Sequence, residues 1–248
     1  MKLLVIGESC VDEFIYGKAE RLAPEAPAPV FVPTRSTQNP GMAANVVANL
    51  KALGAEVDFI SNTNKITKTR YVDDKTNHLL LRVDIGDDKV EPFNVVKFDV
   101  PPDMYEAIVI SDYNKGFLDE YAIAAICNIH PNVFVDTKKP IGKYLSLCKY
   151  LKINEKEFRD SKKFYDGSPE GIEFTNKTIV TLGKEGCKLG NKLYPVEEVA
   201  VKDQSGAGDT FIAGLVWKYV STQDIDKAIT FANECATKVV TKRGVCTV

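Results

Sequence analysis

A glycine-rich turn that leads into an apolar helix contains the residue types of this chain best suited to chemistry. It reads Asp203-Gln-Ser-Gly-Ala-Gly-Asp-Thr-Phe211, and an apolar run follows it. Such a turn directs several backbone N–H groups at one point, where the helix dipole adds partial positive charge. The sequence therefore predicts an anion hole that suits a phosphate, formed by the amides of Gly206, Ala207 and Gly208.

Asp209 is the unusual member of this segment, because a carboxylate beside an anion hole repels the anion. Its presence is explained if it acts as a base that takes a proton from a hydroxyl group. A base next to an anion hole is the arrangement that phosphoryl transfer to an alcohol requires. The alternative is an ordinary acidic residue in the first turn of a helix. The local sequence leaves both interpretations open.

The composition favours one globular domain spanning residues 1–248. The chain is 44% hydrophobic, and its formal net charge is -2. The nearly balanced charge argues against nucleic acid as a partner, and the apolar runs are too short to span a membrane. The N-terminus reads as a first strand rather than a signal peptide, and the six cysteines lack CxxC spacing. We therefore expect a cytoplasmic protein with reduced thiols.

Short apolar runs alternate with amphipathic stretches, which predicts an α/β fold around a mainly parallel sheet. The expected strands cover residues 2–6, 56–60, 107–111, 132–136, 150–153 and 178–182. The expected helices cover residues 42–53, a stretch after Asp119 and about 224–241. Ligands of such sheets bind beyond the carboxyl ends of the strands. Four residues that directly follow strands should line that rim: Asp112, Asp136, Asn154 and Gly183.

Two segments interrupt the alternation, at residues 12–34 and 67–84. Both read as extended pairs outside the main sheet, with prolines in the first and a turn-like run in the second. Charged residues cluster in them. The sequence allows two interpretations, an exposed hairpin with ordinary surface charges or a lid over the ligand rim. Such segments are too small to be stable alone, so we expect a homodimer that pairs the two lids.

The order of these motifs resembles that of the ribokinase-like (pfkB-type) carbohydrate kinases, from Val5 to Val248. The resemblance implies a three-layer α/β sandwich with a mainly parallel central sheet and a small β lid. Segment 203–210 is similar to the family's C-terminal signature, in which the last aspartate, here Asp209, is the catalytic base. The amides of the same segment form the anion hole in that family.

The resemblance also implies a sugar site, an ATP site and a Mg²⁺ ion. The sugar would be held by Asp12, Gly41 and Asn45. The run at 154–157 resembles the family's NxxE motif, and Glu157 would hold the metal through water. The nucleotide would be bound by Asn154, Glu155, Lys156, Glu157, Thr181, Gly183, Gly186 and Asn233.

A narrower resemblance is to the kinase part of the heptose 7-phosphate kinase/ADP-heptose synthases. Residues 21–30, 68–70, 80–84, 111–116 and 242–248 carry it. It implies that D-glycero-D-manno-heptose 7-phosphate is converted to the 1,7-bisphosphate. A phosphorylated substrate needs basic side chains away from the reacting hydroxyl. The predicted substrate residues are Lys68, Arg70, Arg82 and Lys115, together with Asp112.

The chain departs from the family pattern at three places. Met42 replaces a glycine that is usual in the family, and Gln204 replaces a usual threonine. In addition, only six residues separate Ile60 from Thr67, where relatives usually carry another helix and strand. Two alternatives therefore stay open. One is a kinase for fructose phosphate, fructose or ribose, and the other is a catalytically silent sugar- or nucleotide-binding protein. P-loop kinases and dinucleotide enzymes fit worse, because neither GxxxxGK[ST] nor a GxGxxG after the first strand occurs.

Overall fold

The structure is a computed structural model that describes residues 1–98, 101, 103–164, 167–242 and 246–248. Its centre is a sheet of eight strands. In spatial order they are β12 (Lys192–Tyr194), β11 (Cys187–Leu189), β10 (Thr178–Thr181), β9 (Tyr150–Asn154), β8 (Val133–Thr137), β7 (Ala107–Asp112), β1 (Lys2–Gly7) and β4 (Glu56–Ile60). Neighbouring strands from β10 to β4 run parallel, and β11 pairs antiparallel with both β10 and β12.

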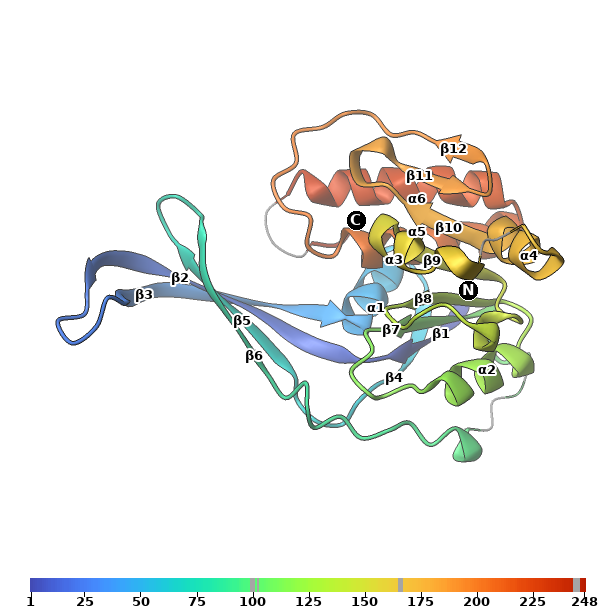
Figure 1. The fold of residues 1–248 in the computed structure, drawn as a ribbon, viewed down its shortest axis with the longest axis horizontal. Helices are drawn as coiled ribbons and strands as arrows, with labels where there is room; N and C mark the ends of the chain where they lie inside the picture. The colour runs from blue at the N-terminus through green and yellow to red at the C-terminus, as the bar shows by residue number, and fades with distance from the viewer. Residues whose placement is uncertain (99–100, 102, 165–166, 243–245) are drawn as a thin grey trace.

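Helices cover both faces of this sheet (Figure 1). They are α1 (Ala43–Ala52), α2 (Glu120–Ile129), α3 (Glu155–Asp160), α4 (Pro169–Lys177), α5 (Ala207–Thr222) and α6 (Ile225–Val240). Alternate residues of a strand face opposite layers, so Leu3 and Val5 pack with α1, α5 and α6, while Leu4 and Ile6 pack with α2 and α4. Strands buried on both faces read as continuous apolar runs, which is the pattern that predicted them.

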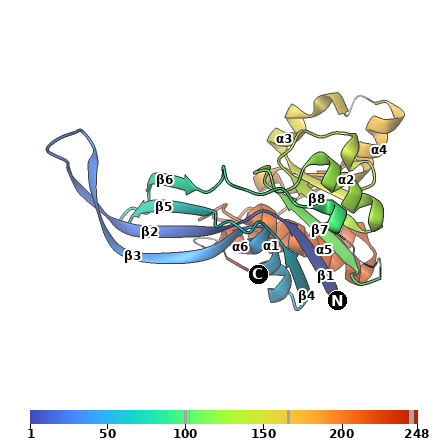
Figure 2. The same cartoon turned by 90° about the horizontal axis from the view of Figure 1, so that it is seen from below.

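A second sheet projects from this body as a long arm (Figures 1 and 2). Its four strands lie in the order β3 (Pro29–Met42), β2 (Ser9–Leu22), β5 (Thr67–Asp73) and β6 (Leu79–Ile85). Strands β2 and β3 pair antiparallel, as do β5 and β6, and β2 runs parallel to β5. The prediction of extended pairs outside the main sheet is confirmed. We call these four strands the lid.

The predicted bounds of the first lid segment, 12–34, are wrong. Strand β2 begins at Ser9, two residues after β1 ends, and β3 continues to Met42. Residues 35–42 have no alternating apolar pattern, and their strand is specified by pairing with residues 9–16. Because β3 ends at Met42 and α1 begins at Ala43, this strand of the lid passes directly into the main body.

Two local predictions agree with the structure. Asp119 caps α2 by accepting a hydrogen bond from the amide of Ala122 at 2.7 Å. Strand β4 is the edge of the main sheet, and residues 61–66 lead from it directly into the lid. Within the part of the chain that is described, none of the helices combines the length and apolar character that crossing a membrane requires.

Candidate active site

Asp209 lies in the first turn of α5, where two distant parts of the chain meet. Its carboxylate accepts hydrogen bonds from Asn45 Nδ2 at 3.1 Å and from Tyr113 Oη at 2.7 Å. Asn45 is on α1, 164 positions earlier in the chain. The structure thus brings the predicted base together with one of the predicted sugar-binding residues, in a buried position.

The surroundings of Asp209 suit a proton acceptor. Burial raises the pKa of its carboxyl group to about 6. The hydrogen bonds from Tyr113 and Asn45 and the charge of Lys152 oppose this rise, and the charge of Asp136 adds to it. A carboxyl group that titrates slightly below neutral pH is mostly ionised at pH 7 and still has a useful affinity for a proton. The site therefore has the electrostatics of a general base.

The predicted anion hole lies at the start of α5, which begins at Ala207. A Cβ atom on Gly208 would be 2.8 Å from Lys152 Nζ, so glycine is what permits this close approach. The Lys152 ammonium is buried and pairs with Asp136 at 2.7 Å. A positive charge beside the helix N-terminus adds to the attraction for an anion. Sequence reasoning missed Lys152, although a lysine inside an otherwise apolar strand was a usable signal.

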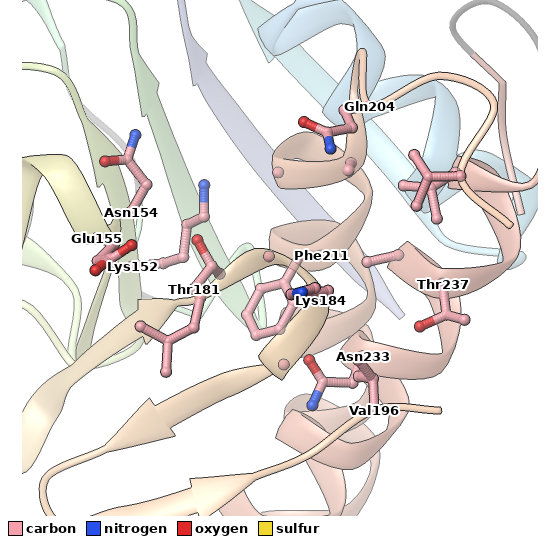
Figure 3. A pocket seen from close by; sticks show the side chains of 18 of the residues that line it. Lys152, Asn154, Glu155, Thr181, Lys184, Val196, Gln204, Phe211, Asn233 and Thr237 are labelled. Atoms are coloured by element: carbon pink, nitrogen blue, oxygen red, sulfur yellow. The ribbon is translucent and has the colours of Figure 1, made fainter. Parts of the chain in front are cut away.

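A pocket of about 840 Å³ opens beside this turn, between the ends of β9 and β10 and the helices α5 and α6 (Figure 3). That volume is in the range of small-molecule and cofactor sites. Its lining reaches the anion hole at Ala207 and Gly208. Seven of the predicted nucleotide residues line it: Asn154, Glu155, Lys156, Thr181, Gly183, Gly186 and Asn233. Lining residues that were not predicted include Lys138, Lys184, Gln204, Phe211 and Thr237.

Glu157 lies in the first turn of α3 and forms reciprocal hydrogen bonds with Asn154. Its carboxylate accepts from the amide and the side chain of Asn154, each at 2.8 Å, and its own amide donates to Asn154 Oδ1 at 2.8 Å. This is a capping box, so part of the NxxE motif is explained by helix initiation. Lys138 Nζ lies 2.9 Å from Glu157 and 3.3 Å from Asp136, and so joins two carboxylates.

These two carboxylates fit a Mg²⁺ ion held mainly by other ligands. Mg²⁺ in kinases is usually bound by one or two protein carboxylates, by water and by the phosphates of the substrate. Among the described residues, no group of three or more His, Cys, Asp or Glu side chains could enclose an ion. Glu157 and Asp136 would therefore hold the metal in part through water.

Several predicted sugar-site residues meet at the base of the lid. Arg70 of β5 forms an ion pair with Asp12 of β2. A Cβ atom on Gly41 would be 2.2 Å from the Asp12 carboxylate, so the chain approaches closely here. The ammonium of Lys68 lies 5.7 Å from the centre of the Tyr113 ring. Lys68, a residue of the lid, therefore contacts the ring of Tyr113, whose hydroxyl donates a hydrogen bond to Asp209.

The remaining predicted substrate residues are engaged with other partners. Arg82 binds both oxygens of Asp84 at 2.7 Å, and Lys115 pairs with Asp87. Asp112 is completely enclosed by Lys139, Thr137 and the amide of Asn114. Through its contact with the amide of Asn114, Asp112 supports the loop that follows β7.

Glu8 is a second buried support of that loop, and sequence reasoning missed it. Its carboxylate accepts hydrogen bonds from the amides of Tyr113 at 2.8 Å, Lys115 at 3.0 Å and Phe117 at 3.2 Å. A glutamate directly after a buried strand was the available signal. Met42, at the end of β3, has φ of 56° and packs with Cys10 and Ile66.

Comparison with known proteins adds to this geometry. A family model described as pfkB family carbohydrate kinase matches residues 86–248. "Bifunctional protein HldE" of Campylobacter jejuni is 32% identical over 284 positions that cover 98% of this chain and 62% of that protein. The protein of the same name from a Nitratiruptor species is 30% identical, with coverages of 99% and 63%. The chain therefore spans less than two thirds of the length of these curated relatives.

Solved structures share the fold at low sequence identity. Ribokinase from Thermotoga maritima has a TM-score of 0.71 and 17% identity, covering 98% of this chain and 94% of that one. Ribokinase from Cryptococcus neoformans in complex with ADP has a TM-score of 0.66 and 15% identity, with coverages of 98% and 95%. These matches confirm the predicted ribokinase-like α/β fold. Of the stretch 242–248, which carried part of the narrower resemblance, residues 243–245 lie outside the described residues.

Proposed function

We propose that this chain, which belongs to the pfkB family of carbohydrate kinases, transfers the γ-phosphoryl group of ATP to the anomeric hydroxyl of a heptose 7-phosphate. The observation that carries the proposal is the buried Asp209 carboxylate, bound by Asn45 and Tyr113 beside the start of α5. Similarity to the proteins named HldE and the basic residues at the base of the lid support the finer assignment. The kinase would act as a cytoplasmic enzyme.

In this mechanism, Asp209 takes the proton of the acceptor hydroxyl as its oxygen bonds to the γ-phosphorus. The amides of Gly206, Ala207 and Gly208 and the ammonium of Lys152 stabilise the charge that develops on the phosphoryl oxygens. Asn45, Asp12 and Gly41 orient the sugar. Glu157 and Asp136 would hold a Mg²⁺ ion, which when bound would neutralise charge on the phosphates of ATP.

A screen of acceptors by ADP release tests the proposal. The panel contains heptose 7-phosphate, fructose 6-phosphate, fructose and ribose, with the Asp209→Asn variant as the background control. We expect the highest kcat/KM for the heptose phosphate. A preference for fructose or ribose would replace the proposed substrate and leave the kinase activity. ADP release at the background rate with every acceptor would support a silent binding protein.

The magnesium requirement should depend on Glu157. We expect Glu157→Gln to raise the Mg²⁺ concentration that gives half-maximal turnover by about 10- to 100-fold, because a carboxylate that acts through water tunes the bound ion. Magnesium titrations of turnover measure this. The matched control is Glu173→Gln, which also removes a carboxylate paired with a lysine, at 3.1 Å, but lies on α4. Equal titration curves for wild type and Glu157→Gln would place the metal elsewhere.

The lid should mediate a homodimer. Its side chains Val32, Leu79 and Leu81 are 57%, 56% and 56% exposed, which is unfavourable for an isolated protomer. We expect a dimer at micromolar concentration by light scattering and a monomer for Leu79→Glu/Leu81→Glu. Ile172→Glu, at a 52% exposed position on α4, is the control and should stay dimeric. A monomeric wild type would exclude this assembly.

A further inference from the structure

Tyr113 contacts the base directly, although no sequence argument assigned it to the site. Its hydroxyl donates to Asp209 Oδ1, while Asn45 donates to Oδ2. Burial raises the pKa of the Tyr113 phenol well above its ordinary value, and the charge of Asp209 adds to this. The phenol therefore keeps its proton and donates it to the carboxylate. As a result, both oxygens of the base are held by neutral donors.

The loop that carries Tyr113 is fixed independently of Asp209. The Glu8 carboxylate binds three of its amides, and Asp112 accepts from Asn114 N at 3.0 Å. Asn114 has φ of 56°, a left-handed conformation that asparagine adopts more readily than most non-glycine residues. A rigid scaffold, rather than a mobile surface loop, thus presents the Tyr113 hydroxyl to the base.

The Tyr113 ring is also held from two sides of the site. The ammonium groups of Lys68, from the lid, and Lys138, after β8, lie 5.7 and 5.8 Å from its centre. Cations at this distance from an aromatic ring are attracted to it. The ring packs in addition on the small apolar cluster that contains Met42. Such contacts leave the hydroxyl little freedom other than to point at Asp209.

We infer that Tyr113 is a positioning residue, which holds the Asp209 carboxylate in the orientation that receives the proton of the acceptor hydroxyl. The inference rests on the proposed kinase reaction. In that reaction, the bond from the acceptor oxygen to the γ-phosphorus forms as the bond from this phosphorus to the ADP oxygen breaks. The acceptor proton passes to Asp209, and Tyr113 keeps its own proton throughout. Its contribution is to reduce the reorientation that the base needs during the reaction.

The burial and the hydrogen bonds of Asp209 define in which direction its pKa changes when Tyr113 is replaced. The hydrogen bond from Tyr113 lowers the pKa of Asp209, against the stronger effect of burial. Removing that bond must therefore raise the pKa and move the acid limb of the pH–rate profile to higher pH. Among the described residues, the other groups that act on Asp209 include Asn45 of α1, Cys10 of β2, Asp136 of β8 and Lys152 of β9.

Tyr113→Phe, which removes one oxygen atom, is the direct test. We expect kcat to fall about 10- to 100-fold, in line with the loss of a hydrogen bond to a charged group, with the KM for ATP unchanged. The acid limb should move to higher pH. Tyr105→Phe is the matched control, because the Tyr105 hydroxyl also donates to a carboxylate, Asp58, at 2.7 Å, outside the site. It should leave kcat and the pH profile as in the wild type.

Two further measurements separate positioning from general support. In an Asp209→Asn background, Tyr113→Phe should cause no further loss, because it acts through the base. The difference in unfolding free energy between the wild type and Asp209→Asn, followed from pH 4 to 9, reports the pKa of Asp209 without any substrate. The same comparison made in a Tyr113→Phe background should give a higher pKa. An unchanged kcat and an unchanged pKa would overturn the inference.

The unfolding measurement also keeps the inference distinct from the proposed function. If no acceptor supports ADP release, the proposed function fails, and the pKa of Asp209 still decides whether Tyr113 acts on it. If Tyr113→Phe does not fold, 3-fluorotyrosine placed at position 113 retains the ring and is a stronger donor. The acid limb, or the pKa from unfolding, should then move to lower pH, and a shift in the other direction would contradict the inference.

Discussion

Asp209→Asn should lower turnover by ~10²- to 10⁴-fold, the usual contribution of general-base catalysis. The substitution retains the size of the side chain and removes its ability to take a proton. ATP binding should persist or become slightly tighter, because a negative charge beside the anion hole is lost. Turnover and nucleotide affinity measured on one preparation test this. Near-normal turnover would show that another group accepts the proton.

Asp209→Asn should also show by how much the ionised Asp209 carboxylate lowers the free energy of unfolding. The pKa of Asp209 is about 6 in the folded protein, above the ordinary value of 3.8. The folded state therefore binds the proton more tightly, and its advantage is complete below about pH 4 and lost as pH rises through 6. Between pH 4 and pH 7, the wild type should lose about 2 kcal/mol of unfolding free energy relative to Asp209→Asn. Urea unfolding at several pH values measures this difference, and a constant difference would contradict the assigned pKa.

Much of the fold and part of the site could be predicted, because their signals are local. The buried strands read as short apolar runs, and Asp119 marks the start of α2 in the sequence itself. The start of α3 at 154–157 was interpreted only as a nucleotide motif, although the structure shows a capping box there. The glycine-rich turn before α5 is also a local feature. Parallel strands then place their carboxyl ends at one edge, which brings these motifs together without further information.

What could not be predicted depends on pairing between distant residues. Tyr113 and Asp209 are 96 positions apart, and only the packed structure aims one at the other. The strand at residues 35–42 is specified by its partner in β2, so no local pattern marks it. Asp112 was expected to follow a strand, but it is the last residue of β7, where its side chain is buried in contact with Lys139 and Thr137. The sequence predicted which residues lie near the carboxyl ends of the strands, but it did not predict where their side chains point.

Arg70→Ala should raise the KM for a sugar phosphate about tenfold or more, with the KM for ATP nearly unchanged. A charge-assisted hydrogen bond contributes roughly 1.5–3 kcal/mol, and arginine binds phosphate through a planar fork that alanine cannot replace. The Arg70 side chain is 16% exposed and pairs with Asp12 in the structure. Arg35→Ala is the matched control, because Arg35 is also a lid arginine paired with an aspartate, Asp74 at 3.3 Å, but is 52% exposed.

The pairing of Arg70 with Asp12 allows two roles that substrate comparison separates. If Arg70 binds the phosphate of the acceptor, Arg70→Ala should impair the phosphorylated sugar, and the unphosphorylated sugar should be poor in the wild type and no worse in the variant. If Arg70 only orients Asp12 toward a sugar hydroxyl, the KM should rise equally for both sugars, because both present that hydroxyl. Unchanged constants for both would mean that Arg70 is a lid residue without contact to substrate. A wild type that prefers the neutral sugar would reject the heptose phosphate and leave the role of Asp209 intact, since the base acts on the hydroxyl and not on the distal phosphate.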